Sequence, residues 1–316
     1  MSAAAVEQGS NPETGEAVGR RRGTGLRRRE AVAGYLFVAP FFLVFLAMLV
    51  VPLFYSGYLS LFREQLIGGT VFTGAGNYDR ALHDATFISG VLRMARFLVI
   101  QVPIMLGLAL LFALALDSGR LRFQRFIRLS IFVPYAVPGV IAALMWGYLY
   151  GRNFGPFAQG ARALGFPAPP FLTNEWMLGS IMNIVTWSFV GYNMIILYAA
   201  LRSIPTELYE AARVDGAGEF RVAWSIKIPA IRPALLLTAI FSVIGTFQLF
   251  NEPNLLQTIA PNVIGRGYTP NLYAYNLAFV AREINYAAAI AFLLGIVIMI
   301  VSYVVQLSAM RKERAS

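Results

Sequence analysis

Long apolar runs constrain this chain more than any other feature of its sequence. Crossing a bilayer takes about 20 mostly apolar residues in one helix, and six stretches meet that requirement. They are expected near residues 34–61, 92–116, 126–150, 177–201, 234–252 and 284–308. Because lipid offers the backbone no hydrogen-bond partner, and because these runs do not alternate in polarity, helices rather than barrel strands are expected. The sequence therefore predicts an all-α polytopic membrane protein with six transmembrane helices.

The composition agrees with a membrane protein and offers few groups for chemistry. Of the 316 residues, 58% are hydrophobic and 13% charged, whereas soluble proteins have about 25% charged residues. The chain has no cysteine, so neither disulfides nor thiolate metal sites are available. Its one histidine, His83, lies in a loop, and no group of His, Asp and Glu suits acid–base or metal chemistry. We therefore expect no catalytic residue, no metal and no cofactor, which argues against a membrane-embedded enzyme.

The basic residues follow the order of the spans. The formal net charge is +10, and most of the 26 Lys and Arg residues lie in residues 20–29, 120–128, 202–232 and 311–314. Basic loops stay in the cytoplasm, so both termini and the central loop are expected on the cytoplasmic side of the cell membrane. No aromatic residues interleave the basic runs, so nucleic-acid binding is not expected. Residues 1–30 are predicted to be a disordered tail, followed by a transmembrane domain over residues 31–316.

The third span carries two prolines inside its apolar run, Pro134 and Pro138. Proline removes a backbone donor and clashes with the preceding turn, so the pair predicts a kink in this helix. Packing geometry and a moving element are both compatible with such a kink.

One long polar segment, residues 205–233, interrupts the apolar chain between the fourth and fifth spans. Pro205 suits the first turn of a helix, and Glu207 and Glu210 favour its N-terminal end. Gly216 permits the positive φ that would end this helix, and a second helical run is expected up to Pro229. The segment is therefore predicted to be a structured helical hairpin at the membrane surface rather than a simple turn.

The sequence of this hairpin resembles the EAA loop of the permease subunits of ABC importers. The pattern of that loop is E-A-A, then D-G-A, then I-x-L-P. This chain follows the pattern except that Ile228 stands in place of the leucine. The residues that carry the resemblance are Glu210, Ala211, Ala212, Asp215, Gly216, Ala217 and Pro229. The resemblance implies a type I (MetI-like) permease fold, in which this loop couples to a separate ATPase. It also implies four kinds of partner: a second homologous permease, a cytoplasmic ATPase dimer, an extracytoplasmic sugar-binding protein and membrane lipid.

Within that family the chain looks most like the carbohydrate-uptake permeases of the maltose and multiple-sugar type. The segments behind this resemblance are residues 34–40 (GYLFVAP), 133–138 (VPYAVP), 186–187 (TW) and 247–252 (FQLFNE). It implies a sugar cargo, di- or oligosaccharide, and a path along spans four and five. The candidate path residues are Trp187, Ser188, Tyr192, Ser242, Gly245, Thr246 and Leu249. Polar residues in a span either line a cavity or bind neighbouring helices, and the sequence leaves both open.

The chain carries no energy source of its own. It lacks the G-x-x-x-x-G-K-[ST] loop that cradles ATP phosphates, and no Asp, Glu, Lys or Arg lies in the middle of a span, as a proton- or sodium-coupled carrier commonly requires. A secondary carrier is therefore the less favoured alternative to an ATP-driven importer. Another small solute, such as glycerol phosphate, is the alternative cargo, although a phosphate would call for Arg or Lys in the path. Neutral amino acids and peptides remain open by the same criterion.

Overall fold

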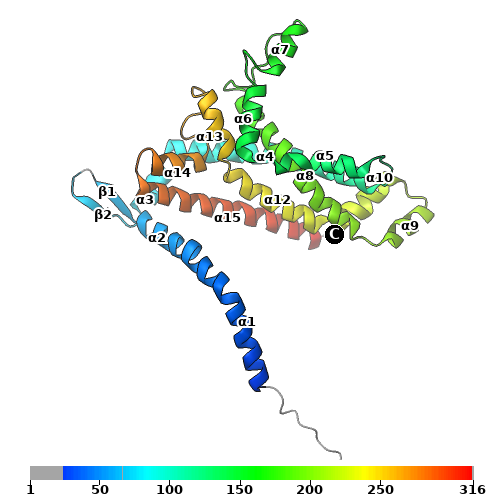
Figure 1. Cartoon of the computed structure of the whole chain (residues 1–316), viewed down its shortest axis with the longest axis horizontal. Coiled ribbons are helices and arrows are strands. Elements are labelled where there is room, and N and C mark those ends of the chain that lie inside the picture. Colours follow the sequence, from blue (N-terminus) through cyan, green and yellow to red (C-terminus); the bar gives the residue numbers. More distant parts are fainter. Residues whose placement is uncertain (1–23, 66, 315–316) are drawn as a thin grey trace, which may run out of the picture. The chain divides into compact units, whose positions relative to one another are not determined.

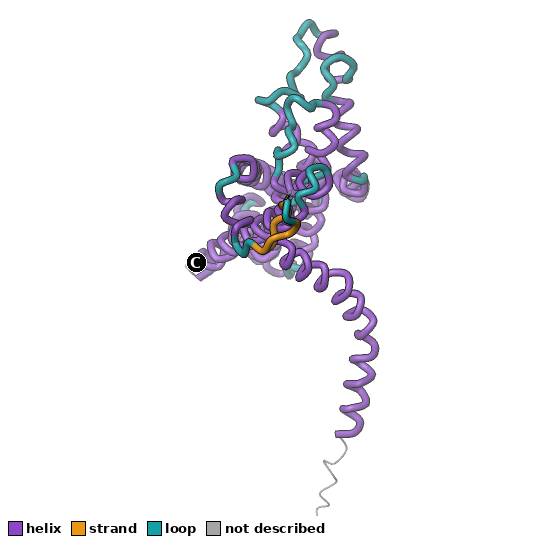
Figure 2. The backbone as a smooth tube through the Cα atoms, turned by 90° about the vertical axis from the view of Figure 1, so that its left-hand side faces the viewer, coloured by secondary structure: helices purple, strands orange, loops and turns teal. Residues whose placement is uncertain are grey.

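The computed structural model describes residues 24–65 and 67–314, and these residues are mostly helical (Figure 2). The chain divides into two compact units between Tyr55 and Ser56. The first unit contains α1 (Thr24–Phe45), a π-helical turn (Leu46–Val50) and the first half of α2 (Val51–Ser60). Of the predicted disordered tail, residues 1–23 lie outside the described residues. Residues 24–30 are helical instead, because adding residues to a formed helix costs far less than nucleating one.

The described part of the chain contains five helical segments long and apolar enough to cross a membrane, and a bent pair of helices that makes six. The five segments are Ala31–Ser60, Ala85–Asp117, Met177–Arg202, Arg232–Ile259 and Ile284–Ser308, and the pair is Gln124–Ala136 with Gly139–Leu149. Each overlaps one predicted span, so the prediction of an all-α membrane protein with six spans is confirmed. The second span begins earlier than predicted, at Ala85. There the Asp84 carboxylate accepts hydrogen bonds from the backbone N–H groups of Thr86 and Phe87 and so caps the helix.

The predicted kink in the third span is a full break. The two helices, α5 (Gln124–Ala136) and α6 (Gly139–Leu149), are bent by 98°. Val137 between them is extended, with φ −76° and ψ 124°, because the ring of Pro138 disfavours the α conformation in the residue before it. One proline would kink a helix, whereas this arrangement ends one helix and starts another.

The spanning helices α4, α8, α12 and α15 form the body of the second unit (Figure 1). Shorter elements occupy its loops, among them a two-stranded antiparallel hairpin and several short helices. Besides α5, α6 and the helices of the segment 205–233, the bounds of its elements are β1 Phe62–Gln65, β2 Gly69–Phe72, α3 Gly76–Leu82, α4 Ala85–Asp117, α7 Pro156–Ala163, α8 Met177–Arg202, α12 Arg232–Phe247, α13 Asn251–Ile259, α14 Pro270–Phe279 and α15 Ile284–Arg314.

The interior of this unit consists of two main apolar clusters. In one, Phe97 of α4, Ile184 of α8 and Phe247 of α12 are almost fully buried. In the other, Ala109 of α4 and Leu197 of α8 pack with Ile231 at the start of α12. Because α4 contributes to both clusters, this helix links the two ends of the unit.

Candidate functional site

A cavity of about 310 Å³ opens between α4, α8 and α12. It also reaches the break after α12, where Gln248, Leu249 and Phe250 leave the helix before α13 begins. The described residues that line it are Gln101, Met105, Val185, Phe189, Tyr192, Asn193, Phe241, Ser242, Gly245, Thr246, Gln248, Leu249, Phe250, Asn251 and Glu252. Five of the seven predicted path residues are therefore brought together: Tyr192, Ser242, Gly245, Thr246 and Leu249.

The two other predicted path residues, Trp187 and Ser188, do not line this cavity. The Trp187 ring packs edge-to-face on Trp146 of α6, with centroids 5.8 Å apart and an interplanar angle of 76°. Ser188 is half-buried one turn before Tyr192. Sequence reasoning included both because helical spacing places them close to the face of Tyr192, but only the packing of α6 on α8 decides which part of that face stays open.

The hydroxyl groups of the cavity keep acceptor capacity. Ser242 donates to the carbonyl of Thr238, and Thr246 donates to that of Ser242, both at 2.8 Å. Each donor is used within α12, while each hydroxyl oxygen retains lone pairs. On the opposite wall, the Gln101 side-chain amide donates to the Thr186 hydroxyl at 3.2 Å. Some of the polar residues in these spans thus bind their own or neighbouring helices as well as lining the cavity.

Aromatic rings supply an apolar surface beside these hydroxyls. Tyr192 stacks on Tyr135 of α5, with ring centroids 4.7 Å apart and an interplanar angle of 19°. Tyr135 in turn meets Phe189, another lining residue, edge-to-face. The rings hold one another in place, so the Tyr192 ring is a fixed feature of the wall.

Glu252 lines the cavity, although it is not among the path residues that the sequence predicted. It was assigned to the outer end of the fifth span, but in the structure it lies at the start of α13, lines the cavity and is only 7% exposed. No Lys or Arg is found among the described lining residues. Pro253, which follows it, is the one sequence signal that pointed to an irregular backbone here. The cavity is thus neutral apart from a single buried carboxyl group.

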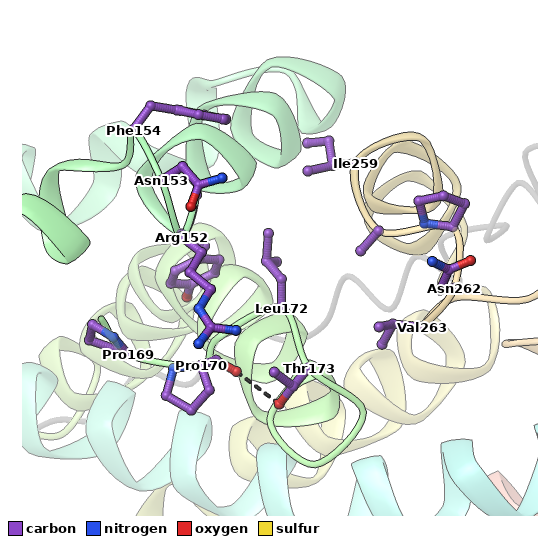
Figure 3. A pocket seen from close by; sticks show the side chains of 14 residues that line it. Arg152, Asn153, Phe154, Pro169, Pro170, Leu172, Thr173, Ile259, Asn262 and Val263 are labelled. Carbon is purple, nitrogen blue, oxygen red and sulfur yellow. Dashed lines mark hydrogen bonds between the residues drawn. The ribbon is translucent and has the colours of Figure 1, made fainter. Parts of the chain in front are cut away.

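A second hollow, of about 340 Å³, lies among three loops: the one after α6, the one before α8 and the one after α13 (Figure 3). Arg152, Pro170 and Thr173 approach one another in it, and the Thr173 hydroxyl donates to the Pro170 carbonyl at 3.0 Å. The Arg162 guanidinium donates to the Arg152 carbonyl at 2.8 Å and so ties α7 to this loop. These hydrogen bonds therefore give the loops a defined shape.

The polar segment 205–233 forms the predicted helical hairpin. Its elements are α9 (Thr206–Val214), α10 (Glu219–Val222), a π-helical turn (Ala223–Lys227) and α11 (Ile228–Ala230). Gly216 has φ +76°, as the sequence predicted. The Ala217 N–H donates to the carbonyl of Ala212 at 2.9 Å, a bond that closes a helix end in which the glycine adopts the left-handed conformation.

The hairpin presents both acidic and apolar groups to its surroundings. Glu210, Ala211, Asp215 and Gly216 are exposed, whereas Ala212, Ala217 and Pro229 are half-buried. Four large apolar side chains are also exposed: Leu208, Val214, Phe220 and Trp224. Within the described residues Arg213 pairs with Glu219 at 3.7 Å rather than with Glu210 or Asp215. The two acids of the EAA-like motif are thus available to a partner.

Comparison with known proteins gives consistent results. Residues 105–312 match the family model described as binding-protein-dependent transport system inner membrane component. The chain is 31% identical to the lactose transport system permease protein LacF of Rhizobium radiobacter, over 92% of this chain and 98% of that protein. It is 30% identical to the arabinooligosaccharides transport system permease protein AraP of Bacillus subtilis, over 86% and 87%. A solved bacterial ABC transporter for import of the acidic polysaccharide alginate contains a similar chain, with a TM-score of 0.79, 19% identity, and coverage of 91% and 99%.

Proposed function

Because this chain belongs to the family of binding-protein-dependent transport system inner membrane components, it is a permease subunit of an ABC importer, and we propose that its cargo is a neutral di- or oligosaccharide. Family membership supplies the transport role, and the cavity described above supplies the argument for the cargo. The observation that carries the proposal is the pairing of an aromatic wall with hydroxyl acceptors in a cavity that contains a buried carboxyl group and no described cation.

A sugar ring suits both walls of this cavity. The C–H face of a pyranose packs on an aromatic ring, here Tyr192, while the sugar hydroxyls donate to Ser242 and Thr246. The amides of Gln248 and Asn251, which also line the cavity, can both donate and accept. The volume of about 310 Å³ lies at the lower end of the range for ligand pockets, about 300–1,000 Å³. A second, homologous permease would complete the path.

The charge of the cavity argues for a neutral cargo. Transfer of an unpaired anion from water into this cavity would be costly, and the described lining residues include no Lys or Arg to pair with it. A phosphate ester or a uronic acid therefore suits this cavity poorly. LacF and AraP, which are named for lactose and arabinooligosaccharides, are closer precedents than a transporter of an acidic polysaccharide.

We propose that the hairpin of residues 205–233 lies in the cytoplasm and docks on an ATPase dimer. Its exposed acids, Glu210 and Asp215, suit basic side chains on a partner, while Leu208 and Val214 offer apolar area. The turn at Gly216 sets the angle between its two helical arms. On the other side of the membrane, the loops around Arg152 and Thr173 are candidates for contact with a sugar-binding protein.

Co-purification and uptake together test this proposal. The assembly purified through this chain should contain an ATPase, and the double variant Glu210→Ala with Gly216→Pro should release it. Gly218→Ala is the matched control in the same turn, because Gly218 has no atom within 4 Å of an added Cβ and no positive φ. Proteoliposomes with the assembly and its binding protein should then take up labelled neutral oligosaccharides in an ATP-dependent way. Uptake that persists without an ATPase, or a hairpin labelled only from outside the cell, would refute the proposal.

A further inference from the structure

The hairpin of residues 205–233, called the coupling hairpin from here on, is joined to α4 by a buried ion pair. The Lys227 ammonium lies 2.6 Å from a carboxylate oxygen of Asp117, and the two side chains are only 9% and 5% exposed. Asp117 is the last residue of α4, and Lys227 is the last residue of the π-helical turn in the hairpin. The pair therefore ties two segments that are 110 residues apart in the sequence.

An aromatic ring and a hollow lined by charged residues surround this pair. The Tyr209 ring lies 4.9 Å from the Lys227 ammonium, which places an aromatic ring of α9 against the cation. Burial, and then the Asp117 carboxylate, raise the pKa of Tyr209, so its phenol stays protonated. The pair and Tyr209 line one hollow together with further charged residues, which are Arg120, Arg202, Glu210, Arg213 and Glu219. Both arms of the hairpin thus meet at the pair, one through Tyr209 and the other through Lys227.

The π-helical turn directs Lys227 toward α4. The Ile228 N–H bonds to the carbonyl of Ala223, five residues back, so the turn holds one residue more than an α-helical turn. Without that residue Lys227 would be rotated by roughly 100° about the helix axis and would lose Asp117. Turns of this kind are found mostly where a helix serves a function.

The helix that carries Asp117 also forms a wall of the cavity. Gln101 and Met105 of α4 line it, and Asp117 lies about 24 Å from Gln101 at 1.5 Å per residue. A buried ion pair adds little net stability compared with apolar residues of the same volume, so stability alone does not explain its presence.

We propose that Asp117 and Lys227 are positioning residues that transmit movement of the coupling hairpin to α4, and through α4 to the Gln101 and Met105 wall of the cavity. This inference rests on the proposed function, since it requires an ATPase that moves the hairpin. The ion pair links the two parts mechanically, because Tyr209 and Lys227 move with the hairpin and Asp117 moves with α4.

The test measures how the accessibility of the cavity wall on α4 changes, and it does not require that the cargo be known. The chain has no cysteine, so Met105→Cys introduces one thiol on α4, and Gly245→Cys introduces one on α12 as a comparison. The probe is a small methanethiosulfonate reagent, applied to the purified assembly with and without trapping of nucleotide on the ATPase. If the reaction rate of neither thiol depends on nucleotide, or if no ATPase is bound, the proposed function fails, whatever the role of the ion pair.

With that dependence established, Asp117→Asn or Lys227→Met should abolish the nucleotide-dependent rate change at Met105→Cys, which we expect to be about fivefold or more, as for an ordinary coupling between sites. The swapped pair Asp117→Lys with Lys227→Asp should restore it. The matched control is Arg120→Gln, which breaks an exposed ion pair of 3.2 Å to Glu219 between the same two parts of the chain and should change little.

Two results with the single variants and the swapped pair would overturn the inference, and a third result applies to a further double variant. One is a single variant that keeps the full rate change at Met105→Cys while its ATPase remains bound. The other is a swapped pair that assembles normally and does not regain the change. If the single variants fail to assemble because they leave a buried charge unpaired, the double variant Asp117→Leu with Lys227→Met, which has no such charge, carries the test. It should assemble and lack the change, and a full rate change in it would equally overturn the inference.

Discussion

Replacing Gly191 by alanine tests how tightly α5 must approach α8. Gly191 is buried on α8, and a Cβ atom there would fall on the carbonyl oxygen of Ile131, 2.7 Å from its carbonyl carbon and 2.8 Å from the Cα of Phe132. Ordinary carbon contacts lie at about 3.5–4.0 Å, so α5 and α8 would have to separate by roughly an ångström. The atoms in the way belong to the backbone and cannot rotate aside.

The size of the effect follows from two opposing terms. Overpacking costs about 1–3 kcal/mol, and a clash with backbone belongs at the upper end. Alanine in place of glycine within a helix stabilises the folded state by about 1 kcal/mol. The expected net loss of about 2 kcal/mol corresponds to a midpoint lower by about 4–8 °C in thermal unfolding. Because Tyr192 follows Gly191 and stacks on Tyr135 of α5, the variant should also weaken uptake.

The matched control is Gly179→Ala in the same helix. Gly179 has no atom within 4 Å of an added Cβ, so this variant should unfold at the same temperature as the unaltered chain or slightly higher. Thermal unfolding of both variants in the same detergent, followed by loss of the monodisperse species, measures the difference. Equal midpoints for the two variants would refute the close approach of α5 and α8.

Two further predictions concern carboxylates. Glu252→Lys should raise the uptake of a uronic-acid oligosaccharide relative to a neutral one by about tenfold, because it gives the cavity a cation and a hydrogen bond to a charged group is worth about 1.5–3 kcal/mol; an unchanged ratio in proteoliposomes would count against the charge argument. Burial favours the protonated form of Asp84, but hydrogen bonds from the hydroxyls of Tyr273 and Tyr286, both 2.7 Å, outweigh it and hold the pKa of Asp84 below its ordinary value. The stability that this shift provides is fully present at pH values above the ordinary pKa of an aspartate, about 4, and is lost as the pH falls through the lowered pKa. Asp84→Asn should therefore lower the free energy of unfolding by about 1.5–3 kcal/mol at pH 7. It should also flatten the acid side of a plot of unfolding temperature against pH.

Local sequence patterns were sufficient for the spans and for the hairpin. Apolar length decides whether a helix can cross a membrane, and a glycine among helix formers decides where a helix ends, so both are readable without knowledge of distant residues. The position of Gly216 at φ +76° is the clearest confirmation. The boundary at Ala85 was missed because it depends on the Asp84 cap, which extends the helix into a segment of mixed polarity.

The cavity was only half predictable. Ser242, Gly245 and Thr246 were among the predicted path residues, and they line the cavity together. The same reasoning included Trp187, which the packing of α6 covers with Trp146. It also left out Glu252, because a residue beyond the end of a span returns to the cavity only if the backbone breaks, as it does between Phe247 and Asn251.

The sequence by itself determined that this protein is a helical membrane protein with six spans, no ATP-binding loop and a polar hairpin of the EAA type. These properties depend on composition and on neighbours within a few residues of one another. Tertiary structure alone decided the burial of Glu252 in the cavity and the pairing of Asp117 with Lys227. Each of these brings together groups distant in the chain, and their contact follows from how the helices pack rather than from any local pattern.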